Sequence, residues 1–345
     1  MVSTAPGIGS VHGILRLGNA FCQAQALLTA VELDLFTVLH GGPATEQEII
    51  GRLGLHGRGL RDFLRLLVAL GLLEEEEDGR YRAAAGPDRY LVSGLPGYVG
   101  GALLGAKANL YPVWDGLTET LRSGRPRSAA DGFAAMLDDP EQLRRYVRMM
   151  EGTLRPLIPL LAEAVDWSGY RSVLDVGGCR GGLAGQLVIT HSGLAGHVFD
   201  LPQMEPLFRE HMAELGTAGA VRFHAGDFFR DPLPRADVLI LGHILHNWPH
   251  GQREELVRRA FRAVNPGGVL LVHDRMLDDE HPDIDNLLAS LIMALVTEEG
   301  SEYTIGELTE LAGAAGFASV SHRRLDDNET LVLCRKAGVR PPPRG

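Results

Sequence analysis

A chain of 345 residues is longer than most single hydrophobic cores, so its length predicts two domains. Hydrophobic residues make up 45% and charged residues 22%, the composition of an ordinary soluble protein. The net charge of −11 argues against a basic surface for phosphate backbones, and no apolar run reaches the roughly 20 residues that span a bilayer, so we expect neither a nucleic-acid nor a membrane partner.

The N-terminal segment and the cysteines both indicate an intracellular protein. MVSTAPGIGSVHG has no basic region followed by an apolar stretch, so it does not resemble a signal peptide. Cys22, Cys179 and Cys334 lie far apart and form no CxxC pair, which indicates a reducing compartment without structural zinc. We therefore expect a cytoplasmic location.

The first third of the chain is predicted to form helices followed by a hairpin. Apolar residues recur at helical spacing over 19–39, a capping box of Thr45 and Glu48 begins the next helix, and RGLRDFLRLLVALGLL forms another. The segment LLEEEEDGRYRAA predicts a hairpin with a two-residue type I′ turn at Asp78-Gly79. Helices followed by a hairpin are the order of a winged helix.

The predicted wing is acidic. A winged helix often binds DNA, but this hairpin carries Glu74 to Glu77 where contacts to phosphates would require Lys and Arg. We therefore expect no DNA binding. A winged-helix regulator that senses a small molecule stays an alternative, which a failure to retard DNA at low salt would dismiss.

The rest of the chain is predicted to hold linker helices and then an α/β domain. A helix over 141–164, bent near Pro156, leads into strand-like runs that alternate with helix-like ones. The predicted strands are SVLDVG, HVFDLP, VRFHAGDF, DVLILGHI, GGVLLVHD and TLVLCRK. This alternation predicts a doubly wound, mostly parallel sheet with ligands beyond the C-terminal ends of its strands. The predicted domains are 1–105 (helical, winged-helix), 106–165 (linker helices), 166–338 (α/β) and 339–345 (disordered tail).

The first predicted strand ends in LDVGGCRGG. Glycines between a strand and a helix let a ligand approach the backbone. A P-loop would end in Gly-Lys-Ser/Thr, which is absent, and a dinucleotide fingerprint starting at Gly177 would need a glycine where Cys179 stands. The pattern instead suits a ligand with carboxylate and ammonium groups, with Asp175 facing the ammonium. Packing of helix on sheet is the alternative.

Acids also end the next two strands. Asp200 in HVFDLP can accept hydrogen bonds from both hydroxyls of an adenosine ribose, although an acid here also suits a helix N-cap. In AGDFF, Asp227 can accept a hydrogen bond from an exocyclic amine, and Phe228 can flank a flat base.

In this order the residues resemble S-adenosylmethionine-dependent O-methyltransferases with a Rossmann-like fold. More narrowly, they resemble the plant caffeate-type and bacterial antibiotic-tailoring family, which has an N-terminal winged-helix dimerisation domain. The segments LLTAVELDLFTVL, RLLVALGLL, VLDVGGCRGG, HVFDLP, GDFF, ILHNW, NPGGVLLVHD and EEGSEYT occur in the family's order. The resemblance implies a homodimer, S-adenosylmethionine as cofactor and S-adenosylhomocysteine as product. The implied cofactor residues are Asp175, Gly177, Gly178, Asp200, Leu201, Gly226, Asp227, Phe228 and Gly242.

The resemblance also implies a general base. It assigns to His246 the removal of a proton from the acceptor hydroxyl, with Asp274 and Glu302 as the acids beside it. A phenol with a pKa of about 10 is a weak nucleophile at neutral pH, and imidazole titrates in the useful range. A structural histidine that caps the next helix is the alternative.

Two positions depart from the family pattern. Asn247 stands where an Asp commonly follows the base, so one neighbouring charge is lost. Cys179 replaces a glycine of the first motif, and its side chain is small enough for cofactor binding to survive.

An aromatic acceptor is expected between the linker helices and the strand ends, because domain junctions favour ligand sites. The candidate pocket residues are Tyr111, Trp114, Met149, Met150, His243, Asn247 and Met293. Methionine and aromatic side chains at such positions also serve as plain core.

The sequence thus predicts methyl transfer to a hydroxyl of an aromatic small molecule, in bacterial natural-product (antibiotic) biosynthesis. Methylation of a ring carbon is an alternative, because deprotonating a phenol also activates its ring. A family member that binds the cofactor without methylating is another.

No metal is expected at the site. His243 and His246 are spaced i, i+3, and His273-Asp274 comes from the neighbouring predicted strand, so a divalent or ferric ion is an alternative. Histidines near one another are nevertheless commoner without a metal than with one.

Overall fold

The computed structural model describes residues 8–95, 97–127, 132–278, 280–281 and 283–338. The chain forms two compact units, Met1–Pro112 and Val113–Gly345. The predicted tail 339–345 lies outside the described residues, and the predicted boundaries at 105 and 165 stay predictions. No described helix has the length and apolarity that a membrane crossing requires.

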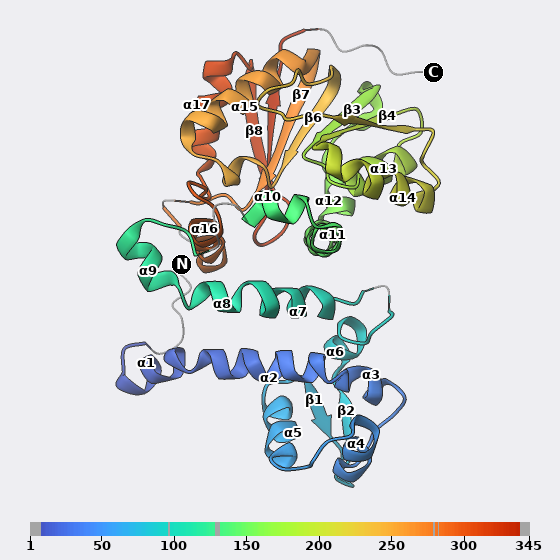
Figure 1. Cartoon of the computed structure of the whole chain (residues 1–345), viewed down its shortest axis with the longest axis vertical. Coiled ribbons are helices and arrows are strands. Elements are labelled where there is room, and N and C mark those ends of the chain that lie inside the picture. The colour runs from blue at the N-terminus through green and yellow to red at the C-terminus, as the bar shows by residue number, and fades with distance from the viewer. Residues whose placement is uncertain (1–7, 96, 128–131, 279, 282, 339–345) are drawn as a thin grey trace. The chain divides into compact units, whose positions relative to one another are not determined.

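The first unit is helical with one small hairpin (Figure 1). Its elements are α1 (Val11–Gly18), α2 (Ala20–Glu32), α3 (Leu35–His40), α4 (Glu46–Leu53), α5 (Leu60–Ala69), β1 (Leu73–Glu75), β2 (Tyr81–Ala83), α6 (Ala85–Tyr90) and α7 (Gly100–Asn109); α8 (Tyr111–Trp114) follows. Phe36, Ile49, Leu64 and Leu67 are fully buried in its core. The predicted order of helices followed by a hairpin is confirmed, as is the capping box at Thr45.

Two local predictions in this unit are wrong. The helix predicted over 19–39 breaks at Asp34, whose backbone is left-handed with φ 56° and whose carboxylate accepts a hydrogen bond from Thr37 Oγ1. The hairpin turn is not type I′, because Gly79 has a positive φ and Asp78 does not. Gly79 N instead donates to Glu76 O, as in a type I turn followed by a left-handed glycine.

Helices open the second unit. They are α9 (Leu117–Ser123), α10 (Gly132–Leu137), α11 (Pro140–Leu154) and α12 (Leu157–Ala164). Asp139 caps α11 by accepting hydrogen bonds from the amides of Glu141 and Gln142, and Pro140 occupies the first turn, where its missing N–H costs nothing. The predicted bend at Pro156 separates α11 from α12.

A seven-stranded sheet forms the core of this unit, in the order β5-β4-β3-β6-β7-β9-β8. The strands are β3 (Ser172–Val176), β4 (Ala195–Asp200), β5 (Val221–Ala225), β6 (Ala236–Gly242), β7 (Val264–Asp274), β8 (Ser319–Arg324) and β9 (Thr330–Arg335). The first five are parallel, whereas β9 runs antiparallel to both β7 and β8. The predicted mostly parallel, doubly wound sheet is therefore confirmed.

Helices cover both faces of the sheet (Figure 1). They are α12, α13 (Gly182–Thr190), α14 (Glu205–Leu215), α15 (His250–Ala263) and α17 (Ile305–Ala315), whereas α16 (Ile284–Val296) packs against α9. Consecutive residues of β3 illustrate the layering: Leu174 packs in the cluster that includes α15 and α17, and Val173 packs in the cluster that includes α12 and α13. This two-faced burial explains the nearly continuous apolar runs of the central strands.

Candidate active site

The predicted site residues gather at the C-terminal ends of the parallel strands. β3 has β4 on one side and β6 on the other, so the strand order reverses at β3. A ligand crevice opens at such a switch point because the connections leave the sheet in opposite directions. Asp175, Asp200, Gly242 and Asp274 all lie at or next to strand ends on this edge.

The glycine loop after β3 is shaped by close approaches. Gly177 has φ 73°, and a Cβ there would overlap the side chain of Ile244. A Cβ at Gly178 would lie 2.6 Å from the carboxyl carbon of Asp175. Larger residues at either position would therefore displace a neighbouring side chain of the site.

Asp175 and Asp200, at the ends of β3 and β4, are both buried, and the charge of Asp200 acts on Asp175. Asp200 Oδ2 accepts a hydrogen bond from Cys179 N at 2.8 Å, and Asp200 Oδ1 accepts one from Leu201 N at 2.7 Å. Burial raises the pKa of Asp200 to about 6, against the effect of these two amides. Burial and the charge of Asp200 raise the pKa of Asp175 to about 7. Both carboxyls therefore titrate close to neutral pH.

Cys179 takes a conformation that favours glycine, with φ 49°. Its backbone amide still donates to Asp200, so the departure from the family's glycine keeps this contact of the loop. The thiol is partly buried and packs against the same hydrophobic cluster as Tyr146 of α11.

At the end of β5 the predicted base-binding residues form a tight turn. Asp227 Oδ1 accepts a hydrogen bond from Phe229 N at 2.8 Å, and Asp227 N donates to Asp231 Oδ2. The ring of Phe228 lies 6.0 Å from that of Trp248, edge to face. A Cβ at Gly226 would meet the ring of Phe199 at 2.6 Å, which explains the glycine there.

His246 lies in a short 3₁₀ turn, Leu245–Asn247, directly after β6. Its side chain is buried, and Nδ1 lies 2.8 Å from Glu302 Oε1 and 3.7 Å from Asp274 Oδ1. The Tyr303 hydroxyl donates to Asp274 Oδ2 at 2.5 Å. The structure thus brings together the three residues predicted for catalysis.

Burial disfavours charge throughout this group. It lowers the pKa of His246, raises the pKa of Glu302 to about 8 and raises the pKa of Asp274 to about 6. An acceptor at Nδ1 fixes the imidazole ring and holds its proton there, which leaves Nε2 as the basic nitrogen.

Arg253 of α15 is a positioning residue that the sequence analysis missed. Its buried guanidinium donates to Leu245 O at 3.2 Å and to Ser301 O at 2.6 Å, so it ties the turn of His246 to the segment of Glu302. It also pairs with Glu307 and lies over the ring of Tyr303. The only signal in the sequence is an arginine near the start of an otherwise amphipathic helix.

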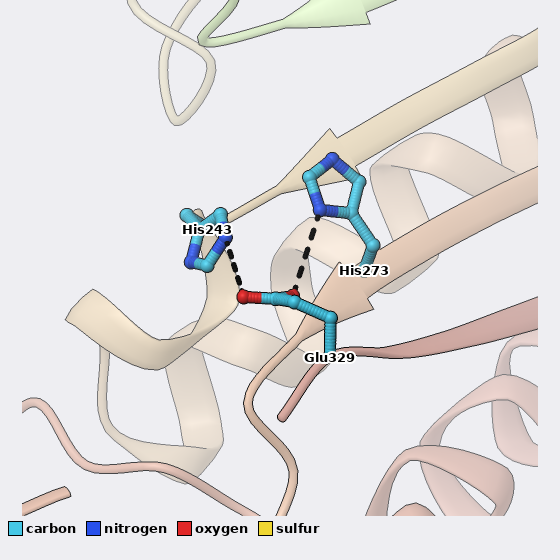
Figure 2. Close-up of side chains that lie close together, drawn as sticks. All are labelled: His243, His273 and Glu329. Atoms are coloured by element: carbon cyan, nitrogen blue, oxygen red, sulfur yellow. Dashed lines mark ion pairs between the residues drawn. The ribbon is translucent and has the colours of Figure 1, made fainter. Parts of the chain in front are cut away.

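Glu329 was also missed, and it is buried beside two histidines (Figure 2). Its Oε1 lies 3.1 Å from His243 Nε2, and its Oε2 lies 4.0 Å from His273 Nδ1. The negative charges of Glu329 and Asp274 raise the pKa of His243 to about 9, although burial alone would lower it. In the sequence Glu329 is one acid among several in LDDNET, so nothing distinguished it.

The predicted pocket residues are spread over several helices. Tyr111 begins α8 and its hydroxyl lies 3.4 Å from Phe21 O, within the first unit. Trp114, Met149, Met150 and Met293 lie in α8, α11, α11 and α16, all partly buried. The Asn247 amide donates to the carbonyls of His243 and Ile244 and so stabilises its own turn. Their role in acceptor binding stays a prediction.

Known domain families match both parts of the chain. Residues 15–93 match the O-methyltransferase dimerisation domain, and residues 114–318 match the O-methyltransferase domain. This chain belongs to the O-methyltransferase family. The predicted family, fold class and enzyme class are thereby confirmed, and the cofactor is S-adenosylmethionine.

Relatives of this methyltransferase span nearly its whole length. The tetracenomycin polyketide synthesis 8-O-methyl transferase TcmO of Streptomyces glaucescens is 47% identical over 94% of this chain and 96% of that protein. The N,N-dimethyltransferase OxyT of Streptomyces rimosus is 39% identical over 93% and 94%. The crystal structure of human N-acetylserotonin methyltransferase in complex with SAM is 26% identical, with a TM-score of 0.85 over 97% of this chain and 99% of that one.

Proposed function

We propose that this enzyme methylates a phenolic hydroxyl of a fused-ring aromatic polyketide, with His246 as the general base. The observation that carries the proposal is the buried His246–Glu302 pair at the end of β6. The acceptor class is supported by the 47% identity to TcmO, whose name assigns it to tetracenomycin polyketide synthesis.

The proposed chemistry needs a base that is present at neutral pH. Bound S-adenosylmethionine supplies an electrophilic methyl group, and the acceptor oxygen must lose its proton to attack well. Burial lowers the pKa of His246, so its imidazole is neutral and able to accept a proton. Asp274 lies 3.7 Å from Nδ1 and offsets the positive charge that forms on the ring, while Glu302, 2.8 Å from Nδ1, holds the ring in place.

The acids at the ends of β3, β4 and β5 suit the polar groups of S-adenosylmethionine. Asp200 keeps lone pairs beyond its two amide contacts, so it can also accept hydrogen bonds from the ribose hydroxyls. Asp175 is a buried acid, and no cationic side chain among the described residues pairs with it, which suits the ammonium of the methionine part. Asp227 and Phe228 are proposed to hold the adenine.

A homodimer is proposed through the first unit, which contains the dimerisation domain. Several large apolar side chains of α1 and α2 are exposed, including Ile14 at 57%, Leu17 at 60% and Phe21 at 61%. Such a patch marks an interaction surface. Ile14→Glu with Leu17→Glu should yield monomers by light scattering, whereas Leu121→Glu, at an exposed leucine of α9, should not. A double variant that stays dimeric contradicts this surface.

The reaction is tested with methyl-¹³C S-adenosylmethionine and a panel of hydroxylated polycyclic aromatics, catechols and hydroxylated aromatic amino acids. Label on oxygen supports the proposal. Label on ring carbon supports C-methylation instead, and label on nitrogen supports the reaction that OxyT's name describes. Cofactor binding with no transfer to any acceptor supports a non-methylating member of the family.

A further inference from the structure

Three side chains that the proposed reaction does not use converge from separate strands. His243 follows β6, His273 lies in β7 and Glu329 immediately precedes β9 (Figure 2). The ligand-type atoms of all three lie within 4.8 Å of one another. The antiparallel insertion of β9 next to β7 brings the carboxylate to the two imidazoles.

This group is paired only in part. His243 Nε2 lies 3.1 Å from Glu329 Oε1 as an ion pair, whereas the buried atoms His273 Nδ1 and Glu329 Oε2 form no hydrogen bond among the described residues. His273 is 1% exposed and Glu329 is 4% exposed, so water does not compensate them readily. Buried polar atoms without partners are costly, and their presence calls for a bound group.

The backbone is shaped to bring the two imidazoles together. His243 has φ 53°, a strained conformation for a residue with a side chain. Gly242 pairs with His273 across β6 and β7, and a Cβ at Gly242 would overlap His273 Nε2. The glycine that the sequence analysis assigned to cofactor binding therefore makes room for the histidine ring.

The acids beside the histidines offer oxygen ligands to a cation. Asp274 and Glu329 are buried, and their oxygens lie 3.7 Å and 3.1 Å from nitrogens of His243. Arg275 lies beside Glu329, with its Nε 3.7 Å from Oε1, but its side chain is 39% exposed. Buried acids are normally paired or coordinate a metal.

We propose that His243, His273 and Glu329 bind a divalent transition-metal ion, with zinc as the best match. Two imidazole nitrogens and one carboxylate are a common ligand set for zinc, and they leave a fourth coordination position open. Magnesium and calcium prefer oxygen ligands and therefore suit this set less well. A second possible group, His243, His246 and Asp274, is less suitable because Glu302 occupies His246 Nδ1. No metal was expected from the sequence because neighbouring histidines are commoner without one, and Glu329 was not among the candidate ligands.

The site is tested on the full-length protein without any assay of methyl transfer. The protein is incubated with zinc chloride and desalted, and its metal content is measured by mass spectrometry. We expect one zinc per chain and a Tm that rises with zinc concentration. Cobalt substitution should give the visible absorption of a four-coordinate site with nitrogen and oxygen ligands.

Variants identify the ligands. Glu329→Gln and His273→Asn should weaken zinc binding at least 100-fold and abolish the cobalt absorption, while His250→Asn, at an exposed histidine, should change neither. Wild-type protein that retains no zinc and shows no zinc-dependent Tm would overturn the proposal and favour a His243–Glu329 ion pair. Because wild-type protein decides this outcome, a variant that fails to fold does not affect it, and the proposed methyl transfer is judged separately.

Discussion

The two halves of the functional sheet edge hold their buried acids in different ways. Beside β3 and β4, Asp200 accepts hydrogen bonds from backbone amides, which do not titrate. Beside β6, β7 and β9, the acids contact histidines, which do titrate. The first arrangement holds the carboxylate in a fixed orientation, which suits the binding of a cofactor, and the second suits the movement of a proton. Substitutions on the two halves should therefore change different kinetic constants.

The largest expected effect is on turnover. His246→Ala should lower kcat by about 10²–10⁴-fold, because it removes the general base. The affinity for S-adenosylmethionine, measured by calorimetry, should stay within about twofold, since β3 and β4 are untouched. His250→Ala is the control. A variant that keeps most of its turnover would refute the base, and one that loses cofactor affinity would show that the halves are coupled.

A substitution on the other half should show the opposite pattern. Asp200→Ala should raise the Kd for S-adenosylmethionine about 10–100-fold, because charge-assisted hydrogen bonds contribute roughly 1.5–3 kcal/mol each. At saturating cofactor, kcat should be nearly normal. Asp200→Asn keeps the size of the side chain and isolates the charge. Unchanged affinity in both variants contradicts the ribose role.

Tyr303→Phe tests how firmly the histidine half is held. It removes the hydroxyl that donates to Asp274 Oδ2. The loss of one such hydrogen bond should lower kcat about tenfold without changing the KM for cofactor. Tyr90→Phe, at a 43% exposed tyrosine, serves as the control. A larger KM with unchanged kcat would assign Tyr303 to binding instead.

The smallest effect is that of pH on cofactor affinity. Asp200 has a pKa raised to about 6, so it is ionised above that pH and loses its charge as the pH falls through it. If only the carboxylate binds the ribose, affinity at about pH 5.5 should be about fourfold weaker than at about pH 7.5, and protonation of Asp175 weakens it further. Calorimetry across this range measures it. In Asp200→Asn the part of the pH dependence that comes from Asp200 should disappear. A wild-type affinity that does not change with pH would contradict the prediction.

Much of the fold was predictable because burial leaves a repeating pattern. The central strands are buried on both faces, so their apolar runs stand out. β8 was missed because it is an edge strand whose residues, SVSHRR, are almost all exposed. The helix break at Asp34 was missed because it depends on a left-handed residue whose carboxylate also accepts a hydrogen bond from Ser93 Oγ, far along the chain.

The candidate site divides in the same way. Asp175, Asp200 and His246 sit in local motifs at strand ends, so chain order alone suggested them. Arg253 and Glu329 act through contacts with residues many positions away, and such contacts exist only after the sheet has closed. The local sequence around each residue does not indicate these distant partners.

The position of β9 has a consequence for the nascent chain. β9 lies between β7 and β8 in the sheet, although it is made after both. During synthesis the ribosome therefore releases two strands that cannot pair with each other, and the gap between them closes only when β9 inserts. Glu329 enters its cluster in that same step, so a nascent polypeptide that stalls before β9 contains Asp175 and Asp200 but lacks the finished histidine cluster.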